Sequence, residues 1–239
     1  MKKFIKIFGY EENALREVLD RIFADASMAE YQLFSKYLDS KVVVEGEFDS
    51  DIDKYLLTIY DVFGGAVYCD EDKTLEECVV EFLTLYGKTV GTAESLTGGA
   101  LASKIVDVAG ASKVFHSGIV SYSNKAKVDY LGISELTLNA HGAVSAEVCY
   151  QMAQGLLTDP NLSYGVSTTG LASSGGEESR EKPVGLVYIG IADEVRCEVF
   201  KYQFEGTRQE IRIKTVNSAL FRLLERIKRP VDFSNMVVN

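Results

Sequence analysis

The sequence predicts an α/β protein, a three-layer α/β/α sandwich with a mixed sheet, preceded by a small α+β domain. From residue 74 onward, helical segments with apolar periodicity alternate with short apolar strands, which is typical of helices covering both faces of a sheet. Near the end of the chain, only Asp193 and Glu194 separate two strand segments, so that pair must be antiparallel and the sheet mixed.

The first 73 residues are expected to form the small α+β domain, with its helices on one face of the sheet. Its predicted strands and helices alternate along residues 2–9, 11–23, 31–48, 51–63 and 66–68. Gly64 and Gly65 follow the second helix and indicate a helix stop rather than a phosphate-binding loop. The acidic run at 70–72 then marks a boundary, which predicts domains at residues 1–73 and 74–239.

The second domain is expected to contain five helices and five strands. The helices are predicted at 74–86, 96–108, 125–131, 146–157 and 207–227, and the strands at 88–93, 117–122, 164–169, 184–192 and 195–204. Asn124 is expected to cap the third of these helices, which Gly132 ends.

Composition excludes several classes of function. The net charge of −10 argues against a nucleic-acid-binding face, which requires a basic patch. Four scattered cysteines and only two histidines favour a reduced, cytoplasmic protein without a metal site. Lys6 interrupts the apolar N-terminal run, so the start of the chain is predicted to be neither a signal peptide nor a membrane span.

Three predicted strand ends carry polar clusters, at residues 94–99, 122–127 and 168–176. Ligand sites in α/β sheets lie beyond the carboxyl ends of parallel strands, so these clusters are expected to converge. The first cluster opens a helix, and a helix N-terminus attracts an anion or an oxyanion. The alternative is that Ser95 or Thr97 merely caps that helix.

Ser95 is a candidate nucleophile, which needs a base and oxyanion donors. Histidine is the usual base, but His116 precedes its predicted strand and His141 lies in a predicted turn. A lysine serves instead if burial lowers its pKa. Lys127 lies on the first turn of a helix just after a strand end, although spacing alone favours a solvated surface lysine.

Other polar residues have two open interpretations each. Tyr122 is either a proton relay or substrate contact, or an aromatic residue of the core. Its spacing from the lysine is Y-x4-K, which excludes the Y-x3-K pair of short-chain dehydrogenases. The loop at 168–176 either binds phosphate through backbone N–H groups or is a crossover connection. Lys182, Arg208 and Arg212 are candidates for positive charge near it.

Six motifs in order resemble one known family. They are Thr-Ala-Glu-Ser-Leu-Thr-Gly-Gly (92–99), Tyr-Ser-Asn-Lys-Ala-Lys (122–127), His-Gly-Ala-Val-Ser (141–145), Thr-Gly-Leu-Ala (169–172), Glu-Lys-Pro-Val-Gly-Leu-Val-Tyr (181–188) and Gly-Thr-Arg…Arg (206–212). Over residues 74–228 the chain closely resembles the CinA C-terminal domain family of competence/damage-inducible proteins and nicotinamide-nucleotide amidases. Residues 1–73 resemble the KH-type domain of longer relatives, whose large N-terminal molybdopterin-binding-like domain is expected to be absent.

The resemblance implies an amidase that converts nicotinamide mononucleotide to nicotinate mononucleotide and ammonia in pyridine nucleotide salvage. It further implies a homodimer that acts on a small nucleotide without metal or cofactor, whereas the expectations of a cytoplasmic location and of no nucleic-acid or membrane partner rest on composition and the N-terminal pattern. In this sequence it makes Ser95 the nucleophile, Lys127 the general base and Tyr122 an assisting residue. Around the substrate it places Glu94, Thr97, Gly98, Gly99, Ser123, Asn124, Thr169, Gly170, Arg208 and Arg212.

Within that set, the resemblance implies distinct roles. Thr97, Gly98 and Gly99 line the oxyanion or phosphate side, while Thr169 and Arg212 help to hold the nucleotide.

The chain departs from the family pattern at two places. Leu96 replaces a cysteine, and Ser173 and Ser174 replace the Gly-Pro of the family loop. A backbone conformation that only glycine adopts is expected to be lost there. A non-catalytic nucleotide-binding or regulatory protein is therefore the alternative function. A scaffold that binds protein or RNA is a third, although the acidic composition and the lack of a Gly-x-x-Gly loop disfavour RNA.

Overall fold

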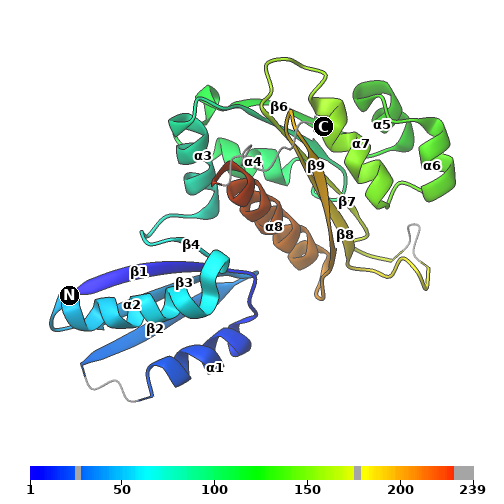
Figure 1. Ribbon diagram of the computed structural model, residues 1–239. Coiled ribbons are helices and arrows are strands. Elements are labelled where there is room, and N and C mark those ends of the chain that lie inside the picture. Colours follow the sequence, from blue (N-terminus) through cyan, green and yellow to red (C-terminus); the bar gives the residue numbers. More distant parts are fainter. Residues whose placement is uncertain (25–27, 175–178, 229–239) are drawn as a thin grey trace, which may run out of the picture. The chain divides into compact units, whose positions relative to one another are not determined.

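The computed structural model describes residues 1–24, 28–174 and 179–228. The chain divides into two compact units, Met1–Thr74 and Leu75–Asn239, each with its own sheet (Figure 1).

The first unit is an antiparallel sheet in the order β2-β3-β1-β4 with two helices on one face. Its elements are β1 (Lys2–Phe8), α1 (Glu12–Ile22), β2 (Ala29–Lys36), β3 (Asp39–Gly46), α2 (Asp49–Phe63) and β4 (Val67–Cys69). Alternate residues of a strand share a face, so Ile5 and Ile7 both meet Leu15 of α1 and Ile52 of α2 in one core. This arrangement confirms the predicted α+β layer with helices on one face.

The second unit is a five-stranded mixed sheet in the order β6-β5-β7-β8-β9. Strands β6, β5 and β7 are parallel, whereas β8 and β9 are antiparallel to their neighbours. Its elements are α3 (Leu75–Leu85), β5 (Val90–Glu94), α4 (Ala100–Val106), β6 (Phe115–Val120), α5 (Asn124–Leu131), α6 (Glu135–His141), α7 (Ala146–Leu156), β7 (Tyr164–Gly170), β8 (Leu186–Ala192), β9 (Cys197–Gln203) and α8 (Arg208–Lys228).

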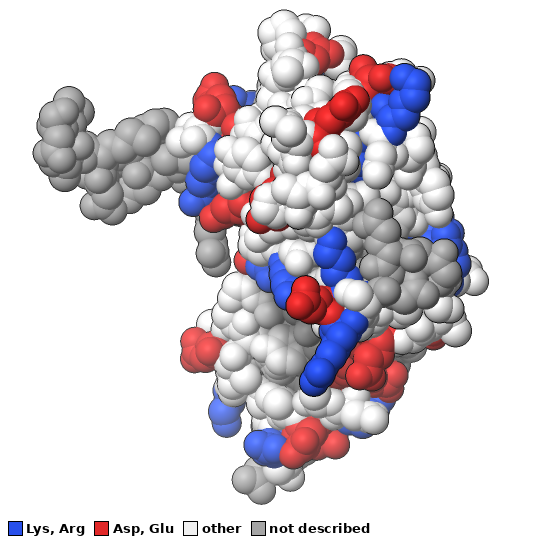
Figure 2. Space-filling view, turned by 90° about the vertical axis from the view of Figure 1, so that its right-hand side faces the viewer, with Lys and Arg blue, Asp and Glu red and all other residues white. Residues whose placement is uncertain are grey.

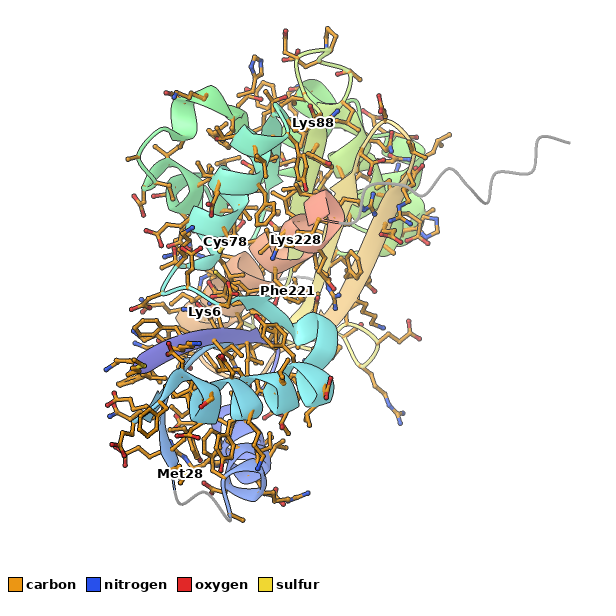
Figure 3. All side chains as sticks on the ribbon, turned by 60° about the vertical axis from the view of Figure 1, so that its left-hand side comes forward. Lys6, Met28, Cys78, Lys88, Phe221 and Lys228 are labelled. Atoms are coloured by element: carbon orange, nitrogen blue, oxygen red, sulfur yellow. The ribbon has the colours of Figure 1, made fainter. Side chains whose placement is uncertain are left out.

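Helices cover both faces of this sheet, which confirms the predicted three-layer sandwich (Figure 1). Helices α5, α6 and α7 cover one face, where Ala93 of β5 packs with Leu131, Val148 and Met152. Helices α3, α4 and α8 cover the other. Figure 3 shows Lys228 at the end of α8, where its ammonium group lies 4.7 Å from the ring centroid of Phe82 on α3.

Several helix boundaries differ from the prediction. The helix expected over 96–108 begins only at Ala100, because Gly98 and Gly99 have φ angles of +60° and +91°, outside the right-handed helical region. Ser123 rather than Asn124 caps α5, since the Ser123 hydroxyl accepts the N–H of Ala126.

Helix α6 was missed by the prediction. Leu138 is the one buried side chain in its seven residues, so the segment is too short and too polar for an apolar period to be recognised. As a result, His141 ends a helix instead of lying in a turn.

Charged side chains of both signs are interspersed on the face shown in Figure 2. In the part of the chain that the structure describes, no helix combines the length and the apolar character needed to cross a bilayer. The expectations of a cytoplasmic location and of no nucleic-acid partner stay predictions.

Gly155 of α7 sets how closely this helix approaches the end of α5. A Cβ atom added there would lie 2.2 Å from the carbonyl oxygen of Leu131, a backbone atom that does not yield easily. Alanine favours a helix over glycine by up to about 1 kcal/mol, but relief of such an overlap costs about 1–3 kcal/mol. The steric overlap therefore decides whether alanine at this position stabilises or destabilises the protein.

We accordingly expect Gly155→Ala to lower the melting temperature of the full chain, as measured by circular dichroism. A rise in melting temperature, the result that helix propensity alone predicts, would contradict the close contact between α5 and α7.

Candidate active site

The three polar clusters meet at one edge of the second sheet. In the register of the parallel strands, Glu94 of β5 lies level with Val120 of β6 and Thr168 of β7. The segments after β5 and β6 therefore begin at the same height, and the polar cluster of β7 begins level with them at Thr168. This is the convergence that the sequence predicted from three separate strand ends.

Glu94 anchors the loop that follows β5. Its carboxylate accepts the backbone N–H groups of Gly99 (2.9 Å), Leu101 (3.0 Å) and Ala102 (2.8 Å), and its side chain is buried. These donors belong to the first turn of α4, which would otherwise have no acceptor. A carboxylate at a helix N-terminus is also favoured by the helix dipole.

This contact changes the interpretation of the helix N-terminus. An anion does occupy it, as the helix dipole favours, but the anion is the protein's own Glu94. The alternative that Ser95 or Thr97 caps α4 is wrong, because neither hydroxyl bonds to a helix N–H. The two hydroxyl groups have other partners: that of Thr97 lies 2.7 Å from the Thr168 hydroxyl, and that of Ser95 lies 3.1 Å from the Lys127 amine. A contact of Glu94 with substrate stays a prediction.

Ser95 and Lys127 lie within hydrogen-bond distance of each other. Lys127 Nζ is 3.1 Å from Ser95 Oγ and also donates to the Ser121 carbonyl at 2.7 Å. Lys127 is only 1% exposed, whereas Ser95 is half-buried. The interpretation of Lys127 as a solvated surface lysine is therefore wrong. It fits Lys125 instead, which is exposed and pairs with Asp129.

The ends of β5 and β7 are joined beside this pair. The hydroxyl oxygens of Thr97 and Thr168 lie 2.7 Å apart, both buried, and Ser95 donates its N–H to the Thr168 carbonyl at 2.9 Å. Thr168 was not among the predicted site residues. Its only sequence signal was its place in a run of polar residues at a strand end.

Two predicted substrate contacts of β7 have structural partners. Thr169 is 1% exposed and donates its hydroxyl to the Ala143 carbonyl at 2.8 Å. Gly170 has no room for a side chain, because an added Cβ would lie 2.6 Å from the Leu186 carbonyl oxygen. Their contacts with a nucleotide stay predictions.

Arg208, Tyr122 and Ser173 form a cluster that links α8 with two of the strand-end loops. Arg208 donates to the Tyr122 hydroxyl at 3.1 Å and to the Ser173 hydroxyl at 2.8 Å. Tyr122 is 62% exposed, so its interpretation as a core aromatic is wrong. Ser173, one of the two residues that depart from the family loop, is thereby tied to a predicted substrate-binding arginine.

The remaining predicted residues lie around this edge with varied partners. Arg212 donates to the carbonyls of Leu96 (3.0 Å) and Thr97 (2.7 Å), so part of its guanidinium is used to hold the loop. Ser123 and Asn124 are exposed at the start of α5. Lys182 donates to the His141 carbonyl at 2.6 Å, and Gly175 and Gly176 lie outside the described residues.

Within residues 1–24, 28–174 and 179–228, no three His, Cys, Asp or Glu side chains are grouped so that they could hold a metal ion.

A family model described as the CinA C-terminal domain matches residues 72–227. A competence-damage inducible protein of Thermoanaerobacter pseudethanolicus is 38% identical over 223 residues, which cover 91% of this chain and 54% of that protein. A CinA-like protein of Kosmotoga olearia is 39% identical over 228 residues, with 91% and 54% coverage. The chain thus spans about half the length of the curated relatives it matches.

Solved structures agree with this match. The competence/damage inducible protein CihA from Agrobacterium tumefaciens is similar with a TM-score of 0.61 at 38% identity, covering 65% of this chain and 96% of that one. A CinA superfamily protein from Klebsiella pneumoniae has a TM-score of 0.62 at 28% identity, covering 64% and 96%. The resemblance of residues 1–73 to a KH-type domain stays a prediction.

We expect Glu94→Ala to lower the free energy of unfolding by about 3 kcal/mol or more, because it leaves buried N–H donors without an acceptor. Glu94→Gln is expected to lose less stability, since its amide oxygen still accepts hydrogen bonds from the backbone. Urea denaturation of the full chain, followed by circular dichroism, measures both.

The matched control is Glu205→Ala, which removes an exposed carboxylate and is expected to change stability by less than about 0.5 kcal/mol. Equal denaturation midpoints for Glu94→Ala and Glu205→Ala would show that the carboxylate does not hold the loop.

Proposed function

The chain belongs to the CinA C-terminal domain family, and on that premise we propose that it hydrolyses the carboxamide of nicotinamide mononucleotide. The products are nicotinate mononucleotide and ammonia, Ser95 is the nucleophile and Lys127 the general base. The supporting observation is the 3.1 Å distance between Lys127 Nζ and Ser95 Oγ. A nucleophile within hydrogen-bond reach of a base is the geometry that covalent catalysis requires.

Burial favours the base form of Lys127. Transfer of an ammonium group out of water disfavours its charged form, and this side chain is 1% exposed. The Ser121 carbonyl accepts one N–H of the amine at 2.7 Å and so restrains its direction. In this proposal the neutral amine accepts the proton of the Ser95 hydroxyl, whose oxygen lies 3.1 Å from Nζ.

The proposed reaction proceeds in two stages. Lys127 takes the Oγ proton as Ser95 attacks the carboxamide carbon, which gives a tetrahedral intermediate. Lys127 then gives that proton to the leaving nitrogen, the C–N bond of the intermediate breaks, and ammonia departs to leave an acyl-enzyme ester. Water, deprotonated by Lys127, attacks the ester, and the collapse of the second intermediate restores Ser95 and releases the carboxylate product.

The nucleotide phosphate is assigned to Arg208 in this proposal. A guanidinium group is suited to a phosphate because its N–H donors match two oxygens. Arg208 is exposed and already oriented by the hydroxyls of Tyr122 and Ser173. Tyr122 therefore assists by positioning Arg208 and by contacting the substrate beside Ser95.

We further propose that the protein acts as a cytoplasmic homodimer in pyridine nucleotide salvage. This part rests on the family resemblance. Light scattering coupled to size-exclusion chromatography measures the mass in solution, and a monomer at micromolar concentration would contradict the dimer.

We expect Ser95→Ala and Lys127→Ala each to lower the rate of ammonia release from nicotinamide mononucleotide by about 10³-fold or more, because the pair acts as one unit. Lys125→Ala is the matched control: it removes an exposed lysine two residues away on the same helix and is expected to keep the wild-type rate.

Turnover that survives in both Ser95→Ala and Lys127→Ala would exclude the mechanism. Tight binding of the nucleotide in calorimetry, with no ammonia released by the wild type, would favour the alternative of a non-catalytic nucleotide-binding protein.

Arg208→Gln is expected to raise the KM for nicotinamide mononucleotide about tenfold or more, because a hydrogen bond to a charged group contributes about 1.5–3 kcal/mol. Nicotinamide riboside lacks the phosphate, so its kcat/KM is expected to be unchanged by the same substitution. Equal losses for nucleotide and riboside would show that Arg208 does not recognise the phosphate.

A further inference from the structure

Two backbone N–H groups next to Ser95 have no acceptor within the part of the chain that the structure describes. Ser95 donates to the Thr168 carbonyl, Gly98 donates to the Ser95 carbonyl at 3.2 Å, and the donors of α4 go to Glu94. Among the described residues, the N–H groups of Leu96 and Thr97 donate to nothing. Such orphan donors are rare in a folded chain, and these belong to residues that are 5% and 0% exposed.

The directions of these two N–H groups follow from the carbonyls that precede them. In a trans peptide the N–H points away from the C=O, and the described residues contain no cis peptide bond. Arg212 Nε binds the Leu96 carbonyl at 3.0 Å, so the Thr97 N–H points away from Arg212. The Ser95 carbonyl accepts from Gly98, so the Leu96 N–H points away from that turn.

Both donors immediately follow the nucleophile. When Ser95 Oγ bonds to a carbonyl carbon, the oxygen on that carbon becomes negative and lies close to the next backbone N–H groups. Serine hydrolases commonly use the N–H after the nucleophile for this purpose. Preorganised donors of this kind are among the largest contributions to catalysis of acyl transfer.

We infer that the N–H groups of Leu96 and Thr97 form the oxyanion hole and that Arg212 is a positioning residue, which holds the peptide that carries the Thr97 N–H. This inference rests on the proposed function. The resemblance implied Thr97, Gly98 and Gly99 on the oxyanion or phosphate side; the inference keeps Thr97, adds Leu96 and leaves out the two glycines. It also moves Arg212 from the nucleotide to the loop.

The role of Arg212 follows from its two contacts. Its Nε binds the Leu96 carbonyl and its Nη2 binds the Thr97 carbonyl at 2.7 Å, so one planar group fixes two successive peptide units. A lysine offers a single point of charge and cannot span both carbonyls. Arg212→Lys thus keeps the positive charge but loosens the peptide that carries the Thr97 N–H. The variant therefore distinguishes a positioning role from electrostatic attraction of a phosphate.

The first experiment is a crystal structure of the full chain with phenylboronic acid. Ser95 Oγ bonds to the trigonal boron, its proton passes to Lys127, and the boron becomes a tetrahedral anion that mimics the intermediate. We expect a boronate oxygen about 3 Å from the nitrogens of Leu96 and Thr97. An adduct whose oxygens contact neither nitrogen, or no adduct at millimolar phenylboronic acid, would overturn the inference.

The second experiment compares Arg212→Lys with Arg222→Lys, the same change on the same helix. Arg222 instead binds Tyr202 and Glu225, so its variant is expected to keep wild-type kinetics. We expect Arg212→Lys to lower kcat about 10–100-fold with little change in KM, on nucleotide and riboside alike, and to weaken phenylboronic acid inhibition in parallel. A rise in KM confined to the nucleotide would return Arg212 to the phosphate and overturn the inference.

Failure of the proposed function is distinguishable from failure of this inference. Wild-type protein that forms the Ser95 boronate on the Leu96 and Thr97 nitrogens, yet releases no ammonia from nicotinamide mononucleotide, would reject the substrate and support the oxyanion hole. Ammonia release by a protein whose boronate contacts neither nitrogen would support the substrate and reject the oxyanion hole.

Discussion

The carboxylate of Glu94, buried in the N-terminus of α4, is the interaction on which the rest of the site depends. It gives acceptors to three backbone donors that would otherwise be buried without partners. It also pins the turn at Gly98 and Gly99, whose left-handed φ angles reverse the chain before the helix begins. Because this internal anion occupies the helix end, Ser95 is left free to face the opposite layer.

Lys127 shows how packing turns a common side chain into a candidate base. Lys127 lies near the start of α5, and its buried amine is within hydrogen-bond distance of the Ser95 hydroxyl and the Ser121 carbonyl oxygen. An isolated buried ammonium is costly, and this is the physical reason for proposing Lys127 as the base. Lys125, two residues earlier, keeps its charge in water beside Asp129.

Parts of this arrangement were predictable from the sequence because they depend on local patterns. The period of apolar residues located most strands and helices of both units, and polar residues at three strand ends located the site. Short or unusual segments were not predicted correctly. Helix α6 was missed because Leu138 is its single buried residue, and the start of α4 was placed too early because Gly98 and Gly99 precede the helix. The capping of α5 by Ser123 instead of Asn124 shows that adjacent capping residues compete, and geometry selects one.

The α/β class, the order of strands and helices, the family and the candidate pair of Ser95 and Lys127 follow from the amino-acid pattern alone. The groups that these residues meet depend on how the layers pack in the folded chain. Register across parallel strands placed Glu94 level with Thr168, and packing of α8 brought Arg212 onto the Leu96 and Thr97 carbonyls. Such contacts join residues more than seventy positions apart, and they are set by the packing of whole layers. Local sequence patterns do not encode that packing.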